Sequence, residues 1–87
     1  MQEGLRDVGV TVLGENVYVL GGERGGTARK EGWRLEGQEW RRIRDMREPT
    51  LNCTVVKSEE RKEIYVIGGI GENGDLKCIQ RYRAEKD

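Results

Sequence analysis

The chain has 87 residues, too few for more than one domain, and only 34% of them are hydrophobic. A chain of this size leaves about 40% of its unfolded surface exposed after folding, so one copy alone can build only a small core. The 16 basic and 16 acidic residues cancel to a net charge of zero, which argues against nucleic acid or an anionic membrane as a partner.

We expect neither a signal peptide nor a membrane span in this sequence. Residues 1–5 lack the basic and apolar regions of a signal peptide, and no run of about 18 apolar residues could cross a membrane. We therefore predict a cytoplasmic protein with no membrane or nucleic-acid partner. In that reducing compartment Cys53 and Cys78 are expected to be buried thiols, with a disulfide or a metal role as the less favoured alternatives.

The first half of the chain predicts a four-stranded antiparallel unit. Residues 9–13 and 16–22 are strands rich in β-branched residues, joined by a short polar turn. A Gly-rich loop leads to a third strand that carries Trp33, and a second turn leads to a fourth strand around 40–43. Pro49 follows in the link to the next unit, where a missing backbone donor is harmless.

The second half repeats the first. Residues 63–69 (EIYVIGG) match 16–22 (NVYVLGG), and the tyrosines and the final glycines are both separated by 47 residues. A strand at 52–57 precedes this run, and a Gly-rich loop and a third strand with Tyr82 follow it. A period in the forties is typical of propeller blades.

These residues together resemble the kelch repeat, which has a Tyr-bearing strand ending in Gly-Gly, a spaced aromatic residue, and a Trp before a terminal Met. The matching residues of the first copy are Tyr18, Gly21, Gly22, Trp33, Trp40 and Met46. Those of the second copy are Tyr65, Gly68, Gly69 and Tyr82. The resemblance implies an all-β fold of kelch-type β-propeller blades, each a four-stranded antiparallel sheet.

The second copy stops where its fourth strand is expected. When the chain end is joined on paper to its start, residues 82–87 followed by 1–8 run in step with 33–46. In that register Leu5-Arg6-Asp7-Val8 falls on Ile43-Arg44-Asp45-Met46, and Gln2 departs from the pattern because it takes the position of Trp40.

We therefore predict one two-blade unit. Residues 1–8 form an outer strand that completes a blade of a neighbouring chain, 9–46 form a full blade, and 47–87 form three strands of a second blade. Two blades cannot surround an axis, and propellers normally need 4–8 blades. Head-to-tail homo-oligomerisation would supply the missing burial, with a trimer favoured over a tetramer and a dimer. An excised fragment of a larger kelch protein is the alternative, and an engineered origin stays open.

No motif in the sequence indicates an enzyme. Residues 69–74 fit the dinucleotide fingerprint GxGxxG, but Glu72 and Asp75 would oppose a phosphate, and a Gly-rich loop also follows the equivalent strand at 21–26. The chain has no His, which removes His-based triads and His metal ligands. We predict no catalytic residue, no metal and no cofactor, with a carboxylate acid–base pair as the remaining enzymatic alternative.

The aromatic residues of the repeat are expected to pack between blades rather than to form a stacking platform for sugars or bases. Arg41, Arg42 and Arg44 follow Trp40 and could be read as a basic patch. We interpret them as charges that protect an exposed outer strand.

Candidate ligand-binding residues lie in the loops after the two Gly pairs and in the link between blades, because loops on a rigid scaffold carry function. They are Arg24, Arg29, Arg47, Asn52, Glu72, Asn73 and Asp75. The resemblance to kelch domains implies binding of a partner peptide, and repeated Arg side chains would suit an acidic one. The predicted function is a self-assembling structural or interaction scaffold, with a peptide-binding kelch module as the alternative.

Overall fold

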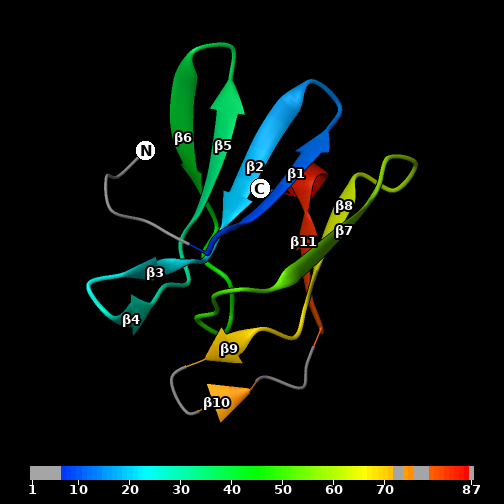
Figure 1. The fold of residues 1–87 in the computed structure, drawn as a ribbon. Coiled ribbons are helices and arrows are strands. Elements are labelled where there is room, and N and C mark those ends of the chain that lie inside the picture. Colours follow the sequence, from blue (N-terminus) through cyan, green and yellow to red (C-terminus); the bar gives the residue numbers. More distant parts are fainter. Residues whose placement is uncertain (1–6, 72–73, 76–78, 87) are drawn as a thin grey trace.

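The computed structural model describes residues 7–71, 74–75 and 79–86, all of which belong to strands, turns, links or one short 3-10 turn. Two main sheets lie side by side, and two small hairpins lie at one end of them (Figure 1). Every strand pair is antiparallel. The described part of the chain holds no helix long and apolar enough to cross a membrane.

The first sheet, called sheet I, contains four strands in the order β1-β2-β5-β6. Their bounds are β1 Gly9–Leu13, β2 Asn16–Leu20, β5 Gly32–Glu36 and β6 Glu39–Ile43. Gly14 and Gly37 begin the two tight turns with φ of 63° each, a conformation that glycine adopts without strain. Sheet I is the four-stranded antiparallel unit that the sequence predicts.

The second sheet, called sheet II, contains three strands in the order β11-β8-β7. Their bounds are β7 Thr54–Ser58, β8 Glu63–Ile67 and β11 Ile79–Arg83, and the 3-10 turn Ala84–Lys86 follows β11. Strand β7 begins two residues later than predicted because Asn52 has a left-handed φ of 54°, which interrupts an extended strand. Within the described residues β11 is an edge strand.

Each Gly pair is followed by a two-stranded hairpin. The first hairpin contains β3 (Glu23–Arg24) and β4 (Thr27–Ala28), and the second contains β9 (Ile70–Gly71) and β10 (Gly74–Asp75). Both lie at the same end of the molecule, called the loop end below (Figure 1). The described parts of the loops that the sequence marked as candidates therefore lie at the same end of the molecule.

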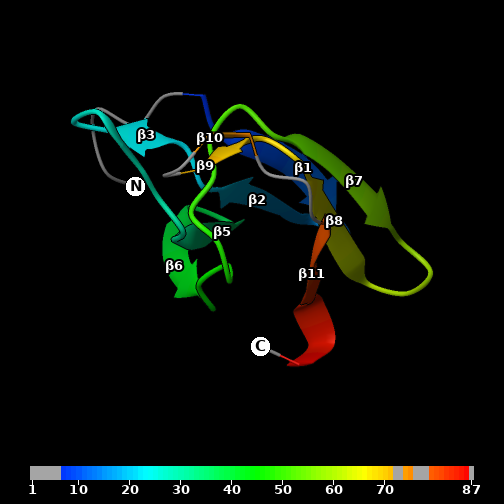
Figure 2. The same ribbon diagram turned by 90° about the horizontal axis from the view of Figure 1, so that it is seen from below.

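Sheets I and II form a wedge. Strands β1 and β7 are in contact on the narrow side, whereas β6 and β11 lie apart on the wide side (Figure 2). A Cβ atom at Gly9 would lie 2.5 Å from Cγ2 of Val55, so glycine permits this close approach of the sheets. The buried core between the sheets comprises Leu13, Tyr18, Leu20, Ile43, Ile64 and Val66.

In the third strand of each sheet, β5 and β11, the observed register matches the two copies differently from the sequence alignment. Val17 lies opposite Leu35 in sheet I, and Ile64 lies opposite Tyr82 in sheet II. Tyr82 is therefore the equivalent of Leu35, and Gln80 takes the place of Trp33. The alignment of Tyr82 with Trp33 was wrong by two residues, because the second and third strands are joined by loops of equal length in both copies.

The position of the N-terminal segment also differs from the sequence alignment. Asp7 has a φ of 57°, nearly that of Asn52, and each residue lies two positions before the first strand of its sheet. Asp7 and Val8 are thus equivalent to Asn52 and Cys53 in the link, rather than to the end of an outer strand. The rest of the predicted outer strand, residues 1–6, lies outside the described residues.

Candidate functional site

The link between the two sheets, residues 44–53, runs from the end of β6 to the start of β7. It is anchored by Thr50, which is fully buried. Its carbonyl oxygen accepts a hydrogen bond from Gly22 N–H (2.8 Å), and its own N–H donates to the Arg29 carbonyl (3.0 Å). Its hydroxyl donates to the carbonyl oxygen of Gly68 (3.3 Å). One threonine therefore contacts both Gly pairs and holds the ends of β2 and β8 together.

The second hairpin is held to the same link. Leu51 and Ile70 exchange two backbone hydrogen bonds of 2.9 Å each, which is the pattern of a hydrogen-bonded pair in an antiparallel ladder. The Asn52 N–H donates to the Asp7 carbonyl (2.8 Å). Backbone hydrogen bonds thus fix the loop end relative to both sheets.

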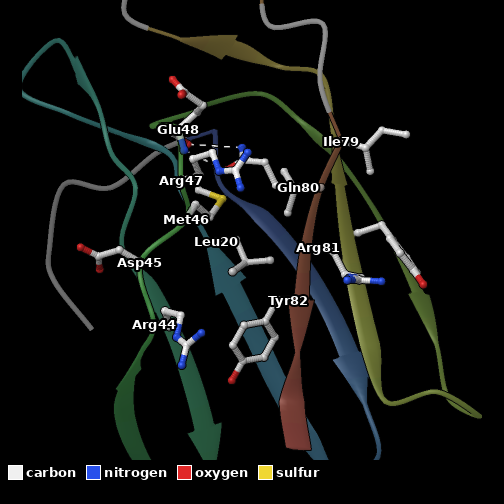
Figure 3. Close-up of a pocket in the computed structure, with 12 residues that line it drawn as sticks. Leu20, Arg44, Asp45, Met46, Arg47, Glu48, Ile79, Gln80, Arg81 and Tyr82 are labelled. Atoms are coloured by element: carbon white, nitrogen blue, oxygen red, sulfur yellow. Dashed lines mark hydrogen bonds between the residues drawn. The ribbon is translucent and has the colours of Figure 1, made fainter. Parts of the chain in front are cut away.

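A cleft of about 680 Å³ opens on the wide side of the wedge, between the link and β11. Leu20, Met46 and Tyr82 form its apolar floor, and charged side chains of residues 44–48 form its rim (Figure 3). The Tyr82 ring packs against Tyr18 at a centroid distance of 5.7 Å and an interplanar angle of 55°, a favourable tilted geometry for two aromatic rings. This inter-sheet cleft combines an apolar floor with polar walls, as ligand pockets do.

Gln80 attaches the link to β11 at the mouth of the inter-sheet cleft. The Glu48 N–H donates to Gln80 Oε1 (2.9 Å), and Gln80 Nε2 donates to the Glu48 carbonyl (3.3 Å), as the dashed lines in Figure 3 show. A side-chain amide that pairs with both backbone groups of one residue fixes the distance between the two segments. This pair of hydrogen bonds joins the link to β11 beside the cleft.

A second cavity, of about 490 Å³, lies at the loop end and is more polar. Arg29, Glu31 and Arg47 are among its lining residues. Arg29 forms an ion pair with Glu31, and this hydrogen-bonded guanidinium lowers the pKa of Glu31 below its ordinary value, against the opposing effect of burial. Arg47 is exposed and lines both this polar cavity and the inter-sheet cleft.

The predicted ligand-binding residues are only partly brought together. Arg29 and Arg47 share the polar cavity. Arg24 lies on β3 and Asp75 on β10, both exposed at the loop end. Asn52 is exposed, and its backbone serves the link, while residues 72–73 lie outside the described part of the chain. The shared feature of this end is therefore a pair of arginines beside one ion-paired glutamate.

The aromatic residues of the repeat divide between two environments. Tyr18 is 2% exposed and belongs to the core, and Tyr82 packs against that core. Trp33 and Trp40 are half-buried residues of β5 and β6 in sheet I. The Arg42 guanidinium lies 5.8 Å from the centroid of a Trp33 ring, within the range of a cation–π contact.

The arginines of β6 lie on the outer strand of sheet I, as the sequence predicts. Arg41 Nε is 2.9 Å from Glu36 Oε1, and Arg42 pairs with Asp45 at 2.8 Å. The two arginine side chains are more than half exposed. These charges form ion pairs along an exposed edge, which supports their interpretation as protection of that edge.

Cys53 is a half-buried free thiol beside the core, and burial raises the pKa of its side chain. The prediction that Cys53 is a buried thiol is therefore confirmed only in part. Cys78 lies outside the described residues.

Thr50, Glu48 and Gln80 are the site residues that the sequence did not reveal. None of them belongs to the repeated pattern, and their contacts join segments 18 to 32 residues apart. A buried threonine between two Gly pairs has no periodic signature. The only available signal was the Gly pairs themselves, which indicate that another backbone approaches closely.

Comparison with known sequences decides the family. A family model described as the kelch motif matches residues 4–47, which contain sheet I and part of the link. The chain belongs to the kelch-repeat family. A putative F-box/kelch-repeat protein of Arabidopsis thaliana is 33% identical over 75 residues, which cover 84% of this chain. The kelch chain described here spans only 20% of the length of that relative.

Proposed function

We propose that this kelch chain is a self-assembling interaction scaffold without catalytic activity. Residues 9–46 and 47–87 would be its two blades, and copies of the chain would associate head to tail into a propeller. One observation carries the proposal. Each sheet has one face that the other sheet does not cover, called its open face below. In the alignment of the two repeats, this open face corresponds to the face of the other sheet that is buried between the sheets.

The open face of sheet I carries Val10 and Val12, which are 54% and 48% exposed. They lie opposite Val19 and Val17, whose repeat equivalents in sheet II are Val66 and Ile64. Those two equivalents are only 2% and 0% exposed, because they pack against sheet I. A second sheet on the Val10 face would therefore reproduce packing that the chain already uses.

The open face of sheet II likewise corresponds to the face of sheet I that is buried between the sheets. Val56, Ile67 and Ile79 are 47%, 39% and 65% exposed on this face. Ile67 and Tyr65 are the repeat equivalents of Leu20 and Tyr18, which are buried between the sheets. Contact between the sheet II face of one copy and the sheet I face of the next would be heterologous, and a constant rotation can close such contacts into a ring.

The number of copies follows from the blade number. Propellers have 4–8 blades, so two blades per chain permit a dimer, a trimer or a tetramer. Six blades, the common number in the family that the sequence resembles, require three chains. We propose the trimer first, the tetramer second and the dimer third.

The test is the molar mass in solution, measured by light scattering over a range of chain concentrations. We expect three times the chain mass of 10.0 kDa. Val12→Lys and Ile79→Lys each place a charge on one open face and should shift the protein to the monomer. Gln38→Lys in the exposed β5–β6 turn is the matched control and should leave the mass unchanged. A folded wild-type monomer at all concentrations would contradict the assembly.

A longer kelch protein is the alternative source of the missing blades. The Arabidopsis relative, of which this chain covers 20%, supports it. Under this alternative the open faces would be covered by neighbouring blades of one polypeptide. The isolated 87 residues would then stay monomeric, and Val12→Lys and Ile79→Lys would not change the mass.

The loop end supports a second candidate function, the binding of an acidic peptide. Arg29 and Arg47 line one polar cavity, and guanidinium groups bind carboxylates through two parallel hydrogen bonds. The test is titration of a fluorescent oligoglutamate peptide that contains no aromatic residue. Arg47→Ala should weaken binding severalfold, whereas Arg61→Ala in the remote β7–β8 turn should not. Equal effects of the two variants would contradict a defined site.

A further inference from the structure

Two threonines of this chain have an arginine three residues before them. Arg24 precedes Thr27 in the first hairpin, and Arg47 precedes Thr50 in the link. An arginine at a fixed distance from a hydroxyl group is the charge pattern by which basophilic protein kinases select their substrates, since acidic groups of the kinase bind the guanidinium. The same position is apolar before the other Ser and Thr residues, which are Thr11, Thr54 and Ser58.

The fold withdraws Thr50 from such a reaction. Thr50 is fully buried, and its hydroxyl donates a hydrogen bond to the Gly68 carbonyl (3.3 Å). A kinase must bring the hydroxyl group within reach of ATP. Thr50 could therefore react only if the link between the two sheets opened, which would break the hydrogen bonds that hold both Gly pairs.

The fold presents Thr27 instead. Thr27 lies on β4, and all four residues from Arg24 to Thr27 are exposed. Gly25 and Gly26 form the turn with φ of 62° and 82°, and a Cβ atom added to either would meet nothing within 4 Å. Figures 1 and 2 show the first hairpin projecting away from sheets I and II. A large enzyme can therefore approach Thr27.

The first hairpin can open at low cost to fit an extended substrate groove. Its two strands pair over two residues each, and a two-stranded hairpin is only marginally stable by itself. The two glycines of its turn adopt extended conformations without strain. None of the residues 23–28 belongs to the buried core, so opening the hairpin leaves that core intact.

The charges around Thr27 favour both recognition and the product. No acidic residue occurs from Arg24 to Lys30, and Arg29 and Lys30 follow Thr27 at the second and third positions. Arg24 also lies directly opposite Thr27 in the register of the hairpin. A phosphate group carries a charge of about −1.5 to −2 at pH 7 and accepts strong hydrogen bonds from a guanidinium. The arginine that marks the site can therefore also stabilise the phosphorylated form.

We propose that Thr27 is a phosphorylation site for a basophilic protein kinase that recognises Arg24. The Thr27 hydroxyl oxygen attacks the γ-phosphorus of ATP, and the bond from that phosphorus to the bridging oxygen of the β-phosphate breaks. ADP leaves, and the hydroxyl proton passes to the catalytic aspartate of the kinase. In the product, the phosphate pairs with Arg24 across the hairpin. The site uses neither open sheet face, so it is independent of the proposed ring.

The test is incubation of the full 87-residue chain with ATP and the catalytic subunit of cAMP-dependent protein kinase, which is basophilic. Mass spectrometry measures the phosphate incorporated, and fragmentation of proteolytic peptides locates it. We expect one phosphate, on Thr27, and none on Thr50. Thr27→Val removes the acceptor hydroxyl and should abolish the reaction.

Matched arginine variants test recognition. Arg24→Ala should lower the initial rate about tenfold, because the ion pair with the kinase is lost. Arg61→Ala removes an exposed arginine from the remote β7–β8 turn and should leave the rate unchanged. A synthetic peptide of residues 21–31 reports the reaction of the same sequence without the fold. It should react at a rate similar to that of the folded chain, because the hairpin opens easily.

Three results would overturn the proposal. The first is phosphate on Thr50 or on another residue in place of Thr27. The second is an equal effect of Arg24→Ala and Arg61→Ala on the rate. The third is a folded chain that takes up no phosphate; reaction of the 21–31 peptide in that case would show that the fold closes the hairpin to the kinase. Molar mass and oligoglutamate binding, which test the proposed functions, are measured separately on the unmodified chain.

Discussion

A Cβ atom at Gly69 would lie 2.2 Å from the Thr50 hydroxyl oxygen. The same threonine lies against the first Gly pair, where a Cβ at Gly21 would be 2.3 Å from its carbonyl oxygen. Both Gly pairs also have positive φ, with values of 67° and 98° in the first and 64° and 95° in the second. The Gly pairs of this kelch chain therefore serve two purposes: they turn the chain after β2 and β8, and they admit the link between the sheets.

Gly69→Ala is expected to lower the free energy of unfolding by about 3 kcal/mol, because it adds backbone strain and a clash with buried Thr50. Gly14→Ala is the matched control. Gly14 also has a positive φ, but a Cβ atom added there would meet nothing within 4 Å, so only about 1 kcal/mol of backbone strain is expected. Urea unfolding of the two variants and the wild type at one chain concentration measures both losses of unfolding free energy. Equal losses would show that contact with Thr50 is unimportant.

Ile64→Ala should destabilise the fold by about 3 kcal/mol, since Ile64 is 0% exposed between the sheets and its truncation leaves a cavity. Ile79→Ala removes the same atoms from a residue that is 65% exposed and should change stability by no more than about 0.5 kcal/mol in dilute monomer. Chemical denaturation at low chain concentration compares them. A large loss for Ile79→Ala in the monomer would mean that its face is covered within one chain.

Glu31→Gln should reduce stability at neutral pH by at most about 1 kcal/mol, because the ion pair with Arg29 is partly exposed. The folded-state pKa of Glu31 is lowered. Its contribution is therefore present above the unfolded pKa of about 4.3 and is lost as the pH falls through the folded value. Unfolding midpoints measured from about pH 7 to about pH 2 should converge for wild type and variant. Glu39→Gln, whose side chain is 76% exposed, should show little effect at any pH.

Cys53 should react slowly with iodoacetamide in the folded protein, because burial raises the pKa of the thiol and only the thiolate attacks. A Cys78→Ser variant isolates this reaction, and the same variant in urea provides the reference rate. The raised pKa also stabilises the fold below the unfolded thiol pKa of about 8.5, and this contribution disappears as the pH rises through the folded value. Equal alkylation rates in the folded and unfolded states would contradict the burial of this thiol.

The local elements of this chain could be predicted from its sequence. β1 has the predicted bounds 9–13, and the Tyr-bearing strands and both Gly pairs lie where the pattern placed them. These features depend on β-branched runs and on glycines in turns, which act over a few residues. The kelch resemblance rested on the same features and is confirmed by the motif match. The cytoplasmic location and the homo-oligomer stay predictions.

The position of Thr50, the true register of Tyr82, the place of Asp7 in a link and the cleft beside β11 were decided by the tertiary structure alone. Each depends on contacts between residues far apart in the chain: Thr50 with Gly68, Ile64 with Tyr82, Asn52 with Asp7, Glu48 with Gln80. An aromatic residue shifted by two positions keeps the same alternation in a strand, so the sequence pattern could not distinguish the two registers. Only the pairing with β8 shows that Tyr82 replaces Leu35.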